Sequence, residues 1–110
     1  MIQTTIAQIE EKIQHGGTIS DEHRTELLTL LNALKHEVSE LSETRQEDAE
    51  SITRFTGLSA HEATRQEINP RLLALSLEGL KYSVSDFEQS HPKLSETVNS
   101  LCHILSNMGI

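Results

Sequence analysis

The stretch that decides the fold is residues 21–55, DEHRTELLTLLNALKHEVSELSETRQEDAESITRF, where apolar residues return at alternating intervals of four and three. These intervals place side chains along one side of an α-helix, as in the seam of a coiled coil. Seven of the nine seam positions are apolar: Leu27, Leu31, Leu34, Val38, Leu41, Ile52 and Phe55. The pattern therefore predicts a helix with a long apolar edge.

The length of this stretch predicts an elongated molecule. No proline or glycine interrupts residues 21–55, so we expect one continuous helix that ends at Gly57. A helix of this size is about 52 Å long, whereas a compact domain of this length has a radius of gyration of about 13 Å. Arg45 and Asp48 are the two polar seam positions. The stretch around them is a solvated point of the seam, a polar contact that sets the register, or a helix break.

A shorter helix precedes this one. Its apolar stripe steps by four, three and four residues through Ile2, Ile6, Ile9 and Ile13. Gly16 and Gly17 should end it, because glycine adopts the left-handed cap conformation without a steric penalty. Thr18 and Ser20 then provide an N-cap, and Asp21 begins an acidic first turn that the helix dipole favours.

One short segment is expected between the long helix and the second leucine-rich helix. Ser59 and Glu62 match a capping box, which predicts a short helix over residues 60–68. Asn69 followed by Pro70 matches an N-cap and the first helical residue, where proline loses no hydrogen bond.

The C-terminal third continues the same alternation. The positions are Leu73, Leu77, Leu80, Val84, Phe87, His91, Leu94, Val98, Leu101, Leu105 and Met108. Two structures fit this pattern. Either one helix runs from Pro70 to Met108 with a kink at Pro92, or a helix ends near Gln89 and another begins at Pro92 with His91 as its cap.

Composition limits the function classes. Leu, Ile, Val and Phe make up 29 of the 110 residues, which is enough to form a core. The net charge of −8 and the three aromatic residues disfavour nucleic acid as a partner, and the acidity disfavours an anionic membrane. The single cysteine, Cys102, excludes an intramolecular disulfide. With no basic leader and no apolar run of about 18 residues, we expect a cytoplasmic protein.

No catalytic or metal-binding motif is recognised. None of the six histidines lies three or four residues from another, and Glu-x-x-His occurs once, at Glu88 to His91. His36 with Glu40 is the other local pair of a histidine and an acid that we consider. Cys102 and His103 are adjacent, so they point in different directions on a helix. We expect no enzyme activity, no cofactor and no metal.

The C-terminal region is similar to a known family. Residues 87–94, FEQSHPKL, and residues 105–110, LSNMGI, resemble the C-terminal part of a family of short bacterial proteins known as a domain of unknown function. The leucine-rich stretch of residues 26–31 also resembles that family. The similarity covers residues 73–110 specifically and 1–42 loosely, and residues 42–69 have no counterpart.

The resemblance implies an all-α bacterial protein and supplies no activity, cofactor or catalytic residue. The residues that carry the resemblance can all be structural. Phe87 would lie in the seam, Pro92 would set a kink or helix start, Gly109 would cap the last helix, and Ile110 would fold back on it. The alternative is that a partner binds the end formed by Gly109 and Ile110 with its free carboxylate.

Together these observations predict one all-α domain over residues 1–110, an elongated hairpin or bundle of four to five helices with coiled-coil-like packing. The seam residues 27–41 would pack against Leu73, Leu77, Leu80, Val84 and Phe87. The expected function is that of a helical interaction module. We favour self-association, as a dimer, because a long exposed seam needs a cover. The alternative is a monomeric adaptor that binds a larger protein through a helical groove or its C-terminus.

Overall fold

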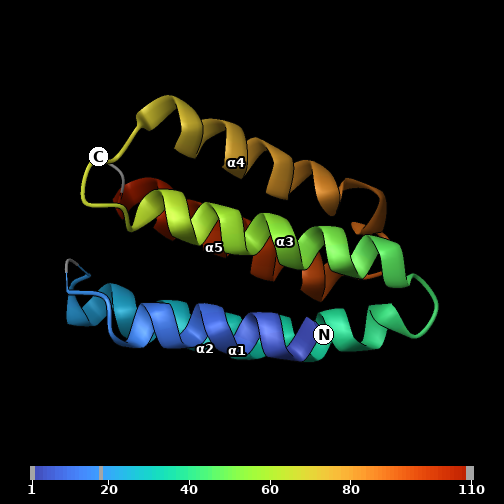
Figure 1. Ribbon diagram of the computed structural model, residues 1–110. Helices are drawn as coiled ribbons and strands as arrows, with labels where there is room; N and C mark the ends of the chain where they lie inside the picture. Colours follow the sequence, from blue (N-terminus) through green and yellow to red (C-terminus); the bar gives the residue numbers. More distant parts are fainter. Residues whose placement is uncertain (1, 18, 109–110) are drawn as a thin grey trace.

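The computed structural model describes residues 2–17 and 19–108, and all of their regular structure is helical (Figure 1). The elements are α1 (Ile2–Gln14), α2 (Asp21–Ser42), α3 (Gln46–Ala63), α4 (Pro70–Ser83), the 3-10 helix η1 (Ser85–Phe87) and α5 (Pro92–Met108). The predicted all-α bundle is confirmed. No helix of the described residues is long and apolar enough to cross a membrane.

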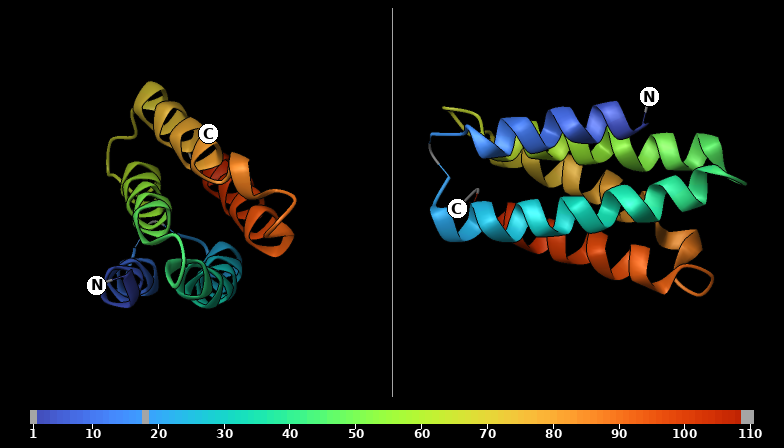
Figure 2. Two further views of the ribbon diagram at one scale, coloured as in Figure 1. Left: turned by 90° about the vertical axis from the view of Figure 1, so that its right-hand side faces the viewer. Right: turned by 90° about the horizontal axis from the view of Figure 1, so that it is seen from below.

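The helices form a bundle in which α3 is central. It contacts each of the other four α-helices, whereas α4 contacts α3 and α5 but not α2 within the described residues. Seen end-on, α1 and α2 lie side by side, and α4 is outermost on the opposite side of the bundle (Figure 2). The molecule measures 37 × 24 × 21 Å, with a radius of gyration of 12.9 Å, which is the size of a compact domain, so the elongated shape predicted from the sequence is wrong.

The expected single helix over residues 21–55 is wrong. Helix α2 ends at Ser42 and α3 begins at Gln46, so the chain reverses between them (Figure 1). No glycine or proline marks this break, but the charges favour it. The last turn of α2 holds no basic residue, while Glu47 and Asp48 lie in the first turn of α3, where the helix dipole stabilises carboxylates. Arg45 precedes α3, and its Nε lies 2.9 Å from Oδ2 of Asp48.

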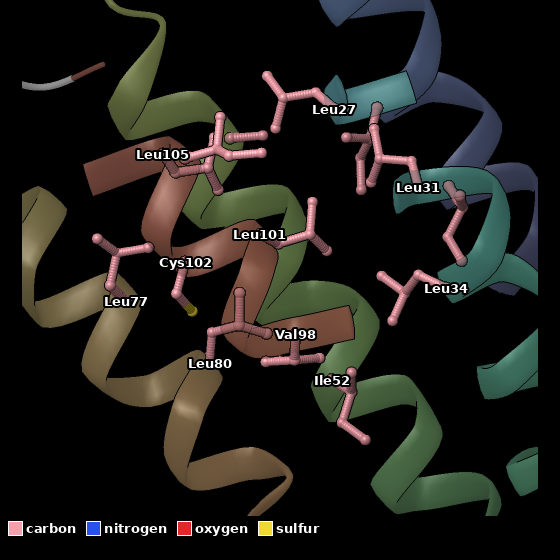
Figure 3. Packing of buried hydrophobic residues seen from close by; sticks show 14 of the residues in the cluster. Leu27, Leu31, Leu34, Ile52, Leu77, Leu80, Val98, Leu101, Cys102 and Leu105 are labelled. Carbon is pink, nitrogen blue, oxygen red and sulfur yellow. The ribbon is translucent and has the colours of Figure 1, made fainter. Parts of the chain in front are cut away.

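The seam residues are buried although the single long helix does not form. Leu27, Leu31 and Leu34 of α2 point toward α5 and α3 (Figure 3). Because α2 and α3 both face one core, the same spacing serves two antiparallel helices of a bundle. The expected packing of α2 against the leucines of α4 is wrong, since those leucines pack on α3 and α5.

Helix α3 extends beyond the end expected for it at Gly57. Gly57 does not end it, and Ser59 and Glu62 lie within it rather than at the start of another helix. Its buried face consists mainly of small residues: Ala49, Thr53, Thr56, Ser59, Ala60 and Ala63. The hydroxyls of Thr53 and Thr56 donate to main-chain carbonyls one turn earlier, each at 2.8 Å, so these buried groups need no partner from another helix. Small side chains let the neighbouring helices approach closely.

Two of the expected caps are confirmed. The side-chain oxygen of Ser20 accepts a hydrogen bond from the main-chain N–H of His23 at 3.2 Å. Asn69 does the same for Leu72 at 3.1 Å, with Pro70 as the first residue of α4. Thr18 lies outside the described residues.

Of the two structures considered at Pro92, the fresh helix is confirmed. Pro92 begins α5, and the carbonyl of His91 accepts from the N–H of Ser95 at 3.2 Å. The preceding helix ends at Ser83 rather than near Gln89, because η1 and a turn intervene.

The segment that resembles the known family packs the turn between η1 and α5 against the rest of the bundle. Phe87 is buried, as its seam position predicts. The guanidinium carbon of Arg45 lies 5.3 Å from the centroid of its ring, and the His91 ring meets it edge-on at 5.8 Å. The roles expected for Gly109 and Ile110 fall outside the described residues.

The corner between α1 and α2 is held by Arg24. Its guanidinium donates to the main-chain carbonyl oxygens of Ile13 at 3.2 Å, of Ile19 at 3.1 Å and of Gly16. These bonds bring charged donors to carbonyls at the C-terminal end of α1, where a helix leaves carbonyls without intrahelical partners, and to the Ile19 carbonyl in the turn before α2. No described glycine has a positive φ, so the expected left-handed cap is absent in these residues. At Gly16 a Cβ would instead lie 2.7 Å from Cδ1 of Ile19, so a side chain there would displace the end of the Ile19 side chain.

Replacing Arg24 with methionine should lower the free energy of unfolding by about 1–3 kcal/mol, because the buried carbonyls lose charged donors while the apolar stem remains. Urea denaturation measures the change. Arg54→Met, on an 80% exposed side chain, is the matched control and should stay within about 0.5 kcal/mol of wild type. Equal effects of the two substitutions would show that the carbonyl bonds do not stabilise the corner.

Candidate functional site

The exposed large apolar residues of the described chain gather on two adjacent helices. They are Leu58 on α3 (45% exposed) and Leu72 (44%), Leu75 (50%) and Tyr82 (81%) on α4. We name this surface the α3–α4 face and include in it Gly79 and the half-buried Phe55, which lie between these residues. Contiguous apolar surfaces of this kind usually mark interaction sites.

Helix α4 carries two apolar stripes. The inward stripe, Leu73, Leu77, Leu80 and Val84, is buried. The outward stripe runs through Leu72, Leu75, Gly79 and Tyr82 at steps of three, four and three, so these residues also share one side of the helix. Helices α3 and α5 cover the first stripe and leave most of the second exposed.

Contact between Phe55 and Gly79 joins the two helices into one surface. A Cβ on Gly79 would lie 2.2 Å from Cε1 of Phe55, so the ring rests directly on the α4 backbone. The two helices run antiparallel (Figure 1). Leu58, one turn after Phe55, therefore lies level with Leu75, one turn before Gly79. The apolar side chains of α3 and α4 thus form one patch.

The α3–α4 face belongs to the least acidic part of the chain. Residues 52–83 contain four basic residues (Arg54, Arg65, Arg71 and Lys81) and three acidic ones (Glu62, Glu67 and Glu78), a net charge of +1. The remaining residues contain 9 − 4 = 5 basic and 17 − 3 = 14 acidic residues, a net charge of −9. A partner approaching this face meets less negative charge than elsewhere.

The interaction residues predicted from the seam are largely internal. Leu27, Leu31, Leu34, Val38, Leu41 and Ile52 are at most 2% exposed. Phe55 alone of the predicted set lies on the α3–α4 face, and Gly109 and Ile110 lie outside the described residues. The sequence signal for the missed surface was the second stripe of α4, offset by one or two residues from the inward one.

A second surface feature is an open hollow of about 580 Å³ between α2 and α5. It is lined by Thr25, Glu26, Thr29, Leu30, Asn99, Ser100, His103 and Ile104. No group of three metal-binding side chains occurs among the described residues. The two local pairs considered from sequence, His36 with Glu40 and Glu88 with His91, form no ion pair within that part of the chain.

Cys102 is placed as a buried apolar residue. Its side chain lies between α5 and α4 beside Leu77 and Leu80 (Figure 3) and is 1% exposed. Burial raises the pKa of the thiol to about 11, against the opposing charge of Lys81. The thiol therefore stays protonated near neutral pH, which is unfavourable for a nucleophile.

Glu37 is a partly buried carboxylate at the contact between α2 and α5. It lines a hollow of about 250 Å³ with His91 and Lys93, and its Oε1 is buried without a hydrogen-bond partner in the described residues. Burial raises the pKa of Glu37, while a hydrogen bond with Thr97 and the charge of Lys93 act in the opposite direction. The folded state therefore disfavours the ionised form.

Glu37→Gln should stabilise the protein at pH 7. A carboxyl whose pKa is raised by folding destabilises the folded state above that pKa, and the cost disappears as pH falls to the unfolded value. We expect a higher melting temperature than wild type at pH 7 and a vanishing difference near pH 4. Glu11→Gln, exposed on α1, is the control and should show no comparable gain. A gain that persists undiminished at low pH would exclude this cause.

Gly79→Ala should have opposite effects in two backgrounds. In wild type the new methyl displaces the Phe55 ring, and overpacking of this kind costs about 1–3 kcal/mol, more than the roughly 1 kcal/mol gained in helix propensity. In a Phe55→Ala background the gain alone remains, so the same change should stabilise. A double-mutant cycle by urea denaturation measures both. The same sign in both backgrounds would contradict a direct contact.

Comparison with known proteins gives one match. A family model described as a domain of unknown function (DUF4404) matches residues 2–110. The match includes residues 42–69, for which the sequence analysis found no counterpart. No curated protein and no solved structure matches the chain.

Proposed function

The chain belongs to the family described as a domain of unknown function (DUF4404), and we propose that it is a non-enzymatic interaction module that binds a second copy of itself through the α3–α4 face. The observation that carries the proposal is the outward stripe of α4, which no other described element covers. Its largest member, Tyr82, is 81% exposed. Large, open side chains of this kind are more typical of an interface than of a free surface.

The size of the patch supports a dimer of moderate affinity. Its four exposed side chains present roughly 400–500 Å². Two copies facing one another would bury about 1,000 Å² with the rim included, near the lower limit for a specific interface. An interface of this size is consistent with dissociation constants of about a micromolar.

The reason for self-association differs from that expected from sequence. The seam of residues 27–55 needs no external cover, because the bundle buries it. The uncovered apolar surface lies on α4 instead. The alternative, a monomeric adaptor, would use either the same face or the hollow between α2 and α5 for a different protein.

The test is the effect of a charge on the stripe. Leu75→Glu should convert a concentration-dependent dimer into a monomer of 12.3 kDa, because dimerisation would bury the carboxylate among apolar side chains. Light scattering on a sizing column, from about 1 to 100 micromolar, measures the mass. Gln8→Glu adds the same charge to an exposed residue of α1, which does not contact α4 in the described residues, and should leave the dimer intact.

Circular dichroism must show that both variants keep the wild-type helical content. A wild-type chain that stays monomeric over the whole concentration range would refute self-association and favour the adaptor alternative. Dissociation by both substitutions alike would show that the outward stripe is not the interface.

A further inference from the structure

The edge charges of α4 specify how two copies would meet. We infer that α4 packs antiparallel to α4 of the second copy about a two-fold axis, and that Arg71 of each copy pairs with Glu78 of the other. This inference rests on the proposed self-association. It adds the orientation of the two chains and the residues that select a second copy over other partners.

Arg71 and Glu78 lie on the same edge of the outward stripe. Each immediately precedes a stripe residue, Leu72 and Gly79 respectively, so the two are seven residues apart, or about 10 Å along the helix. Both are exposed, and neither forms an ion pair with any other described residue. Helix α3 flanks the opposite edge of the stripe, where Phe55 lies against Gly79.

A two-fold axis perpendicular to α4 makes this edge self-complementary. The rotation places the edge against the same edge of the second copy but reverses its direction. Arg71 then faces Glu78 of the partner, and by symmetry Glu78 faces the partner's Arg71. The same rotation brings α3 over α3, so Leu58 and Phe55 are covered as well. This arrangement pairs both charges and brings Leu72 and Leu75 of the two copies together near the axis, whereas Tyr82 lies toward the start of the partner's α4.

A parallel arrangement lacks this match. When two parallel helices meet through one stripe, the edge of each faces the opposite edge of the other. In this molecule the opposite edge of α4 is the side held by α3, with Ser76 buried on it. Arg71 and Glu78 would then face no opposite charge on α4. The charge pattern therefore selects the antiparallel pair.

Charge reversal tests the pairing directly. Arg71→Glu or Glu78→Arg alone turns two attractive pairs into two repulsive ones and should weaken the dimer roughly 10- to 30-fold. The double variant Arg71→Glu/Glu78→Arg exchanges the two charges and should return to near wild-type affinity. Sedimentation equilibrium measures each dissociation constant. High salt should reduce the differences between the variants, since exposed charges are screened.

The sharper readout is a mixture of the two single variants. Each new charge then faces an opposite one, so an equimolar mixture should form heterodimers in excess of the statistical half. Native mass spectrometry, with one variant isotopically labelled, counts them. Lys81→Glu makes the same charge change on α4 away from this edge and is the control. It should neither weaken the dimer comparably nor bias the pairing.

The outcomes separate the two proposals. If the wild type dimerises and Leu75→Glu abolishes the dimer, but the mixture is statistical and the double variant is not restored, the antiparallel pairing is wrong and the proposed function stands. If the folded wild type is monomeric throughout, both proposals are wrong.

Discussion

The bundle depends on how closely its helices can approach α3. Four neighbours surround this helix, and an approach from that many sides is possible because its buried face carries alanine, serine and threonine where a larger residue would separate the helices. Burying hydroxyl groups normally costs free energy, but Thr53 and Thr56 bond to carbonyls of their own helix. Leucines and isoleucines on the surrounding helices then supply the apolar area that stabilises the fold.

The position of α4 follows from this arrangement. With α1 and α2 on one side of α3, the remaining helices must lie on the other, and α4 becomes the outermost element. An outermost helix needs only one apolar side for folding. The second apolar side of α4 is therefore unexplained by folding, which is why we assign it to an interface. Gly79 contributes both to folding and to the proposed interface. Its missing side chain lets Phe55 pack against α4, and this contact extends the patch onto α3.

The charges of the chain act at three different levels. At the reversal between α2 and α3, they favour a helix start because Glu47 and Asp48 meet the positive end of the α3 dipole. Arg24 donates to carbonyl groups at the end of α1 and in the turn before α2. The exposed pair Arg71 and Glu78 has no such internal role in the described residues. Its contribution in a dimer would be to orientation and partner choice more than to affinity.

Local chemistry in the sequence determined where most helices begin and which side chains are buried. The Ser20 and Asn69 caps and the burial of Leu27 to Leu41 follow from neighbouring residues and from helical periodicity, whereas the periodicity left a kinked helix and a fresh helix at Pro92 equally open. The same periodicity did not reveal the break near Arg45, because seven-residue spacing is the same in one long helix and in two antiparallel helices facing one core. Only the tertiary structure decided which apolar stripe stays uncovered. Both stripes of α4 have helical spacing, and burial of one rather than the other depends on where α3 and α5 lie, which no local pattern contains.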